Sequence, residues 1–185
     1  TVSEKLQYKL KNDIKILNVV QFLEKYILPR LDELVKKPLS EDVACYYGCL
    51  LVRPNKVMKD ARFEDPMSMD IIMQKLGAKA IDWPFKTECC GAGFSVSKTE
   101  IVGELSGKIV RSAVDRGAKA IVVACPMCHS NLDMRRPAIE SYLKRKVDIP
   151  VIYITQAIAL AMGLTPKQAG LQRHFVPVNL SVTQN

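Results

Sequence analysis

The chain has 185 residues, of which 48% are hydrophobic and 25% charged, and this composition is typical of one globular domain that buries a core. No apolar run reaches the roughly 18 uncharged residues of a membrane span, and the start is charged, so we expect neither a membrane span nor a secretory signal. The net charge of +8 comes with only 6% aromatic residues, which argues against a nucleic-acid partner and leaves an anionic substrate or an acidic protein partner open.

The first 40 residues are predicted to form an N-terminal linker and helical arm, ahead of a second unit at 41–185 that contains every cysteine. Asn12 and Asp13 can cap a helix that ends near Pro29. Apolar residues continue at helical spacing over 31–35. We therefore expect two helices joined near the proline.

Beyond the arm, short apolar segments alternate with helical patterns, which predicts an α/β fold with a parallel sheet of about four strands flanked by helices. The expected strands span residues 43–47, 78–83, 118–124 and 149–154. The expected helices span about 66–76, 97–116, 126–146 with a break at Pro137, and 155–162. A loop is expected over 53–66, and a loop or short helix from Gly163, ending in an extended tail over 175–185.

Two identical words, Gly77–Ile81 and Gly117–Ile121, support this alternation. In each word the glycine is expected to end a helix and the next residues to begin a strand, because glycine readily adopts the left-handed conformation that closes a helix. Ser97 with Glu100 three residues later predicts a capping box, and Thr155 is expected to cap the last helix.

The six cysteines fall in three tight groups: Cys45 and Cys49, Cys89 and Cys90, and Cys125 and Cys128. Cys49 follows the first predicted strand, Cys89 and Cys90 the second, and Cys125 and Cys128 the third. The carboxyl ends of parallel strands meet at one edge of a sheet, where such sheets bind their ligands. Six cysteines in a chain of this size indicate metal or redox use in a reducing compartment, so we expect a cytoplasmic protein. The sequence thus predicts a metal-cluster site at the carboxyl ends of the strands.

Thiolates are the ligands of iron–sulfur clusters. Cys89 and Cys90 are adjacent, so they cannot easily bind one ion together but can hold two neighbouring irons. Cys125 and Cys128 suit one helical turn that starts after the first thiol. Gly91 and Gly93 are expected to let backbone N–H groups approach cluster sulfurs and tune the reduction potential.

The spacing of these motifs resembles that of a known family. Cys49, a long gap, Cys89-Cys90-Gly91, a second long gap and Cys125-Pro126-Met127-Cys128 resemble the cysteine-rich CCG domain in the B subunit of heterodisulfide reductase. The words around these cysteines are similar too: 44–49, 82–88, 124–128 and 131–133. Full-length members of the family carry two such domains, so the resemblance implies that 41–185 is a C-terminal CCG domain and that the N-terminal CCG domain is missing from this chain.

The resemblance implies a noncubane [4Fe-4S] cluster, made of two fused iron–sulfur units and held by five cysteines: Cys49, Cys89, Cys90, Cys125 and Cys128. It implies an oxidoreductase that cleaves a disulfide reductively with two electrons, such as the heterodisulfide of coenzymes M and B. It also implies a complex of several subunits, in which electrons arrive through a ferredoxin-like C subunit from a flavin-containing A subunit.

Two residues near the cluster motif have separate expectations. Cys45 lies in a predicted strand, and we expect it to be a buried structural thiol rather than a ligand. His129 follows Cys128 directly and is either a residue of the helix surface or a proton donor beside the cluster, which makes it the candidate catalytic residue.

Other interpretations of the cysteines stay open. Four sulfurs could close a tetrahedron around a structural Zn²⁺, and Cys125 with Cys128 could form a thioredoxin-like dithiol. Cys125-Pro-Met-Cys128-His129 also matches a c-type haem attachment sequence, which would leave the other four cysteines without a role. CCG domains resemble parts of glycolate or lactate oxidising systems, glycerol-3-phosphate dehydrogenase and thiol:fumarate reductase as well, where the domain transfers electrons.

Overall fold

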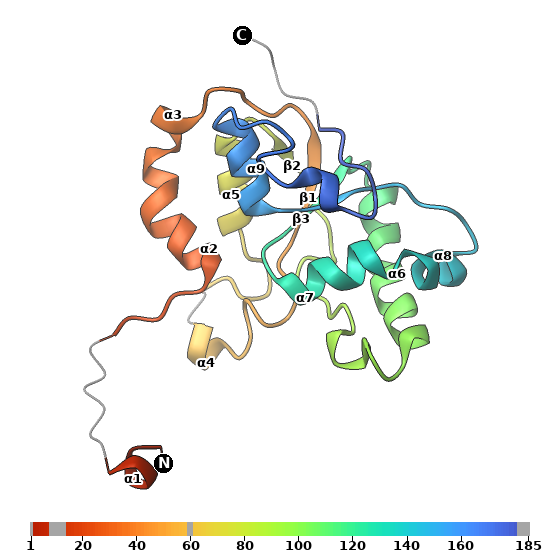
Figure 1. Ribbon diagram of the computed structural model, residues 1–185, viewed down its shortest axis with the longest axis horizontal. Coiled ribbons are helices and arrows are strands. Elements are labelled where there is room, and N and C mark those ends of the chain that lie inside the picture. Colours follow the sequence, from red (N-terminus) through yellow and green to blue (C-terminus); the bar gives the residue numbers. More distant parts are fainter. Residues whose placement is uncertain (1, 8–13, 59–60, 181–185) are drawn as a thin grey trace.

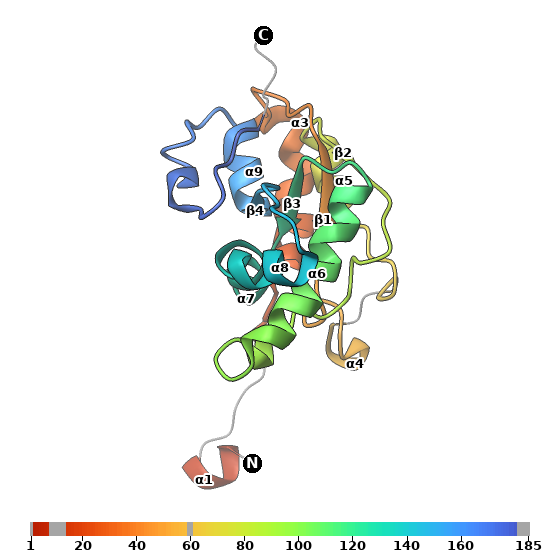
Figure 2. The ribbon, with the colours of Figure 1, turned by 90° about the vertical axis from the view of Figure 1, so that its right-hand side faces the viewer.

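The computed structural model describes residues 2–7, 14–58 and 61–180 of the chain. A parallel sheet of four strands lies at its centre (Figures 1 and 2). The strands are β1 (Asp42–Tyr46), β2 (Lys79–Ala80), β3 (Ala120–Val123) and β4 (Val151–Tyr153), in the spatial order β2-β1-β3-β4. The predicted α/β fold with a four-stranded parallel sheet is confirmed.

Helices cover both faces of this sheet (Figure 1). The first face carries α2 (Val19–Phe22), α3 (Leu31–Leu34), α5 (Ser68–Lys75) and α9 (Ile154–Ala161), and the second carries α6 (Thr99–Asp115), α7 (Pro126–His129) and α8 (Arg136–Leu143). Side chains alternate along β1. Val43 and Cys45 therefore join the core of the first face, while Ala44 and Tyr46 join the core of the second.

The helical arm begins later than the sequence predicted. Residues 14–18 are not helical, and α2 is capped by Asn18, whose Oδ1 accepts a hydrogen bond of 2.9 Å from the backbone N–H of Gln21. The predicted cap at Asn12 and Asp13 lies outside the described residues. An asparagine three residues before a glutamine, as in Asn18 and Gln21, is as good a signal for a helix start as the predicted cap.

The helical arm changes type near Pro29, where the sequence predicted that two helices join. The π-helix η1 (Leu23–Ile27), the 3-10 helix η2 (Leu28–Arg30) and α3 follow α2 without a gap. Pro29 lies in the first turn of η2, where its missing N–H removes no helical hydrogen bond.

Further along the chain several predicted boundaries differ. Strand β2 has two residues instead of six, and β4 has three. The segment 126–146 forms α7, the π-helix η4 (Ser130–Met134) and α8, with the break at Arg135 rather than Pro137. Short helices also form where loop or linker was expected: α1 (Val2–Leu6), α4 (Asn55–Met58) and η3 (Ala92–Phe94). The short helix η5 (Leu171–Arg173) lies in the segment after Gly163, where a loop or short helix was predicted.

Two helices end at the predicted glycines, but two others do not start at the predicted caps. Gly77 and Gly117 have φ of +91° and +83°, and each ends a helix that leads into a strand, as predicted. The capping box of Ser97 and Glu100 does not form, because α6 starts after Lys98. Thr155 does not cap α9, because that helix begins at Ile154 and its N-cap is Tyr153.

The segment between β2 and the paired cysteines is fastened to the carboxyl end of β1. The carbonyl oxygen of Lys86 accepts hydrogen bonds from the backbone N–H groups of Tyr47 and Gly48, at 2.8 and 3.0 Å. The indole N–H of Trp83 donates to the carbonyl of Cys45 at 3.1 Å. The loop that leads to Cys89 therefore lies against the residues that lead to Cys49.

A buried ion pair holds the same segment through its side chain. The ammonium group of Lys86 lies 3.2 Å from Asp70 and 3.1 Å from Asp65, and the side chains of Lys86 and Asp70 are only 6% and 2% exposed. The hydroxyl of Tyr47 donates to Asp70 at 2.7 Å. Burial lowers the pKa of Lys86, but the two carboxylates more than offset this and leave the pKa raised, so the lysine stays charged.

Replacing Lys86 by Met should lower the free energy of unfolding by about 3–5 kcal/mol, because it leaves the buried Asp70 carboxylate without its cation. Urea denaturation measures this loss. The matched control is Lys79→Met, whose exposed ion pair with Asp42 contributes no more than about 1 kcal/mol. Equal losses in the two variants would contradict a stabilising role for the buried pair.

Candidate metal centre

The five predicted ligands follow β1, β2 and β3, whose carboxyl ends point to one edge of the sheet. All six cysteines of the chain are free thiols. Cys89 is exposed, Cys49 and Cys125 are partly buried, and Cys90 and Cys128 are buried. The buried pair lies in the core of the second sheet face, and Cys125 packs against that core.

The five sulfurs fall into two contacting groups, which the adjacent residues Cys89 and Cys90 join along the backbone. The Sγ atoms of Cys90 and Cys128 are 3.8 Å apart. Cys125 shares a thiol hydrogen bond with Cys128, and Cys49 shares one with Cys89. The structure therefore brings together all five cysteines that the sequence singled out, from three distant segments.

The contacts divide the thiols by proton affinity. The thiol of Cys128 hydrogen-bonds both of its neighbours, which lowers the pKa of Cys125 to about 6 and that of Cys90 to about 7. The pKa of Cys128 is raised by the same bonds, and burial followed by the charge of Cys89 raises that of Cys49. Two of the five are thus ready to be thiolates near neutral pH, the form that binds metals.

Cys90 is positioned by polar residues that sequence reasoning missed. The side-chain amide of Asn131 donates to the carbonyl oxygen of Cys90 at 3.1 Å and reaches its Sγ at 3.6 Å. Ser106 donates to the same carbonyl at 3.0 Å, and Ser95 donates to the amide oxygen of Asn131 at 2.8 Å. Asn131 is fully buried. The sequence signal for Asn131 was its position in the segment 131–133, which resembles the family.

The glycines of the site have different roles. Gly48, which sequence reasoning also missed, has φ of +65°, and a Cβ there would lie 2.8 Å from the Sγ of Cys128. Gly91 also has a positive φ, and its N–H donates to the Sγ of Cys89 at 3.4 Å, in line with its predicted role. Gly93 faces open space, with nothing within 4 Å of an added Cβ, so its approach to a cluster stays a prediction.

Cys45 lies apart from the five. It is fully buried in the core of the first sheet face, whereas Cys90 and Cys128 belong to the second. Burial raises the pKa of its thiol well above the usual value. A buried structural thiol, as predicted, is what the structure contains.

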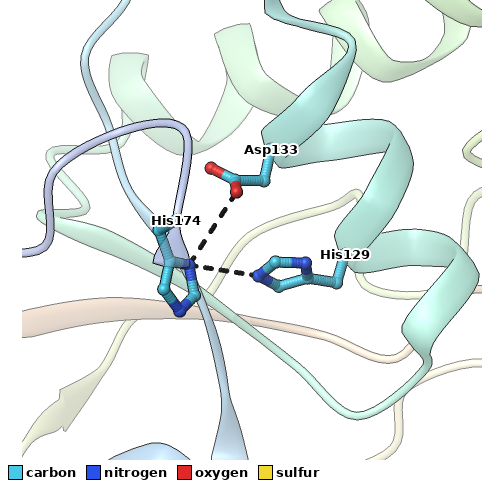
Figure 3. Close-up of side chains that lie close together, drawn as sticks. All are labelled: His129, Asp133 and His174. Carbon is cyan, nitrogen blue, oxygen red and sulfur yellow. Dashed lines mark hydrogen bonds and ion pairs between the residues drawn. The ribbon is translucent and has the colours of Figure 1, made fainter. Parts of the chain in front are cut away.

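His129 is half-buried rather than a residue of the helix surface. Its ring stacks on Tyr153, with centroids 4.4 Å apart, and its Nε2 lies 3.2 Å from Nδ1 of His174 (Figure 3). Burial lowers the pKa of His129, which favours the neutral imidazole. Its predicted catalytic role stays a prediction.

The fold and the site define an α/β cysteine-rich domain with five clustered thiols at the carboxyl edge of a parallel sheet. Residues 43–133 match the family model of the cysteine-rich domain, CCG. This part of the chain belongs to the CCG family, and most of the chain is distantly homologous to the B subunit of heterodisulfide reductase. None of the described helices is long and apolar enough to cross a membrane.

Two of the relatives come from methanogens. The chain is 31% identical over 172 residues to the B subunit of the ferredoxin/F(420)H(2)-dependent CoB-CoM heterodisulfide reductase of Methanosarcina acetivorans, covering 90% of this chain and 56% of the relative. It is 32% identical over 169 residues to the B subunit of the ferredoxin:CoB-CoM heterodisulfide reductase of Methanosarcina mazei, covering 88% and 55%. The chain thus spans about half the length of these relatives.

A third relative belongs to another complex. The chain is 30% identical over 143 residues to the 8-methylmenaquinol:fumarate reductase membrane anchor subunit of Wolinella succinogenes, covering 77% of this chain and 50% of the relative. Among solved structures, a hypothetical protein from Helicobacter pylori matches 96% of this chain and 32% of its own, with a TM-score of 0.63 and 16% identity. That likeness shows a shared fold alone.

Replacing Gly48 by Ala should destabilise the protein more than replacing Gly117 by Ala. Both glycines have a positive φ, which costs an alanine about 1–2 kcal/mol. Only at Gly48 would the added Cβ also collide with a sulfur, because nothing lies within 4 Å of Gly117. Urea denaturation compares the two variants, and equal losses would show that Cys128 is not held against this backbone.

Proposed function

We propose that Cys49, Cys89, Cys90, Cys125 and Cys128 hold a noncubane [4Fe-4S] cluster. We further propose that the chain is the iron–sulfur part of a heterodisulfide reductase-like complex, which cleaves a disulfide by two-electron reduction. The observation that carries this proposal is the gathering of the five thiols at one edge of the sheet in two contacting groups, Cys125, Cys128 and Cys90, and Cys49 and Cys89. The homologues in methanogens are subunits of such oxidoreductases, which supports it further.

The donor set suits an iron–sulfur cluster better than a single zinc ion. A structural zinc ion takes four ligands, one fewer than the five sulfurs present. Its four sulfur ligands would also have to surround a single ion. Among the described residues, the three donors that lie within 4.8 Å of one another are His129, Asp133 and His174, rather than cysteine sulfurs. A series of thiols spread over a wider area fits a group with several irons.

The chain's own residues prepare this site in two ways. The lowered pKa values of Cys90 and Cys125 make thiolates available without removal of a tightly held proton. The N–H groups of Gly91 and Asn131 donate to the sulfurs of Cys89 and Cys90, and such bonds favour the reduced state of a cluster. When bound, the cluster supplies electron transfer and iron atoms with affinity for sulfur.

The exposed side of the site suits partners outside this chain. Cys89 is exposed, and Leu50, Phe94 and Met127, which lie next to or near the ligands in sequence, are 65%, 42% and 46% exposed. Because the chain spans about half of its relatives, we propose that an N-terminal CCG domain covers this edge in the complete protein. A ferredoxin-like C subunit would deliver electrons from a flavin-containing A subunit.

A second candidate function is electron transfer within another oxidoreductase complex, of the thiol:fumarate reductase or glycolate oxidase type. The similarity to the fumarate reductase subunit of Wolinella succinogenes favours it. The two candidates share the cluster and differ in whether a disulfide reacts there. Adding CoM-S-S-CoB to the reduced, loaded protein should change its EPR signal under the first proposal and leave it unchanged under the second.

Cluster content is the direct test of the ligand set. Anaerobically purified protein should contain about four irons per chain with matching sulfide, and Cys90→Ser should lose or convert the cluster. The matched control is Cys45→Ser, which lies in the opposite core and should retain the full iron content. Stoichiometric zinc without iron, or unchanged iron in Cys90→Ser, would contradict the proposal.

A further inference from the structure

A second group of metal-binding side chains lies beside the cysteines and uses nitrogen and oxygen donors. His129 ends α7, Asp133 lies in the π-helix η4, and His174 follows η5 in the C-terminal segment. The three side chains point toward one another from these separate elements (Figure 3). The chain contains two histidines, and both belong to this group.

The spacing of the three donors suits a metal ion. Nε2 of His129 and Nδ1 of His174 are 3.2 Å apart. Two imidazole nitrogens at 2.0–2.1 Å from a tetrahedral ion lie about 3.3 Å apart. The Oδ2 atom of Asp133 is 3.9 Å from Nδ1 of His174, about half an ångström more than this spacing, and the three ligand atoms all lie within 4.8 Å of one another.

Groups outside the trio orient its donors. Nε2 of His174 donates to Oε1 of Gln156 at 3.1 Å, which leaves Nδ1 of the neutral ring with its lone pair directed at the other two donors. The amide of Gln156 is itself fixed, because its nitrogen donates to Ala169 and its oxygen accepts from the N–H of Tyr153. Outer hydrogen bonds of this kind fix the tautomer and angle of histidine ligands in metal sites.

The carboxylate is held in the same manner. The backbone N–H groups of Phe175 and Val176 donate to Oδ2 and Oδ1 of Asp133 at 2.9 and 3.2 Å. The side chains of Asp133 and His174 are only 1% and 3% exposed. Asp133 also lies in a π-helical turn, a rare distortion that occurs frequently at functional sites. A buried negative charge beside two imidazoles favours a cation between them.

We propose that His129, Asp133 and His174 bind a divalent transition-metal ion of the zinc class, at a site distinct from the five cysteines. Two imidazoles and one carboxylate are ligands that Zn²⁺ accepts, with a fourth position left for water. The alternative is that a hydrogen bond between the two imidazoles, with no ion, fastens the C-terminal segment to the end of α7. The two arrangements differ in what the ring nitrogens bind.

Nitrogen NMR of the protein labelled at histidine separates these possibilities. Because the chain has two histidines, their ring signals can be assigned without ambiguity. Zinc that binds only cysteines coordinates neither ring and therefore does not give the shift expected for a histidine ligand. Titration with excess Zn²⁺ should shift Nε2 of His129 and Nδ1 of His174 together, with the other nitrogen of each ring remaining protonated. The readout needs no iron in the protein, so its failure is independent of the proposed cluster.

Three variants sharpen the test. Asp133→Asn removes the charged ligand but keeps an oxygen for the backbone N–H of Phe175, and it should weaken Zn²⁺ binding at the histidines at least tenfold. Gln156→Leu should weaken it about 10- to 100-fold, as is typical when the partner of a ligand is lost. The exposed Asp148→Asn is the matched control and should bind Zn²⁺ as the wild type does.

Either of two results would overturn the proposal. Ring signals that do not move in millimolar Zn²⁺ would leave the hydrogen bond as the whole role of the group. Shifts of equal midpoint in the wild type, Asp133→Asn and Gln156→Leu would indicate adventitious zinc binding that uses neither the carboxylate of Asp133 nor the orientation imposed by Gln156. Circular dichroism of each variant confirms that it is folded.

Discussion

The candidate metal centre depends on one backbone contact, in which the carbonyl of Lys86 accepts hydrogen bonds from two successive N–H groups at the end of β1. These bonds set the segment before Cys89 against the segment before Cys49. The charged end of the same lysine is buried with Asp70, so the loop is fastened on both its backbone and its side chain. This contact thus helps to fix the position of Cys89 relative to Cys49.

The second face of the sheet supplies the other half of the arrangement. Asn131 and Ser106, from η4 and α6, both hold the carbonyl of Cys90, while Gly48 leaves room for the sulfur of Cys128. Cys49, Cys89 and Cys90 thus come from loops and Cys128 from α7, while the side chains that hold Cys90 come from helices packed on the sheet. A site built in this way is set by the fold, and the same packing brings His129 to His174 at its side.

The sequence predicted the parallel sheet, the helix ends at Gly77 and Gly117, and the convergence of five cysteines, because all three follow from local patterns and strand direction. The pair of Lys86 and Asp70 could not be predicted, because the identity of a charged residue does not show whether its side chain is buried or solvated. The contact between His129 and His174 spans 45 residues and depends on the path of the C-terminal segment. Helix starts were missed where several polar residues could cap, as at Asn18.

Anomalous X-ray scattering at the iron edge, from crystals of the anaerobically purified protein, tests the central claim most directly. The account predicts several iron peaks at the carboxyl edge of the sheet, within bonding distance of all five clustered sulfurs, and none at Cys45. A lone peak at the zinc edge surrounded by four of these sulfurs would contradict it, as would disulfide bonds between them.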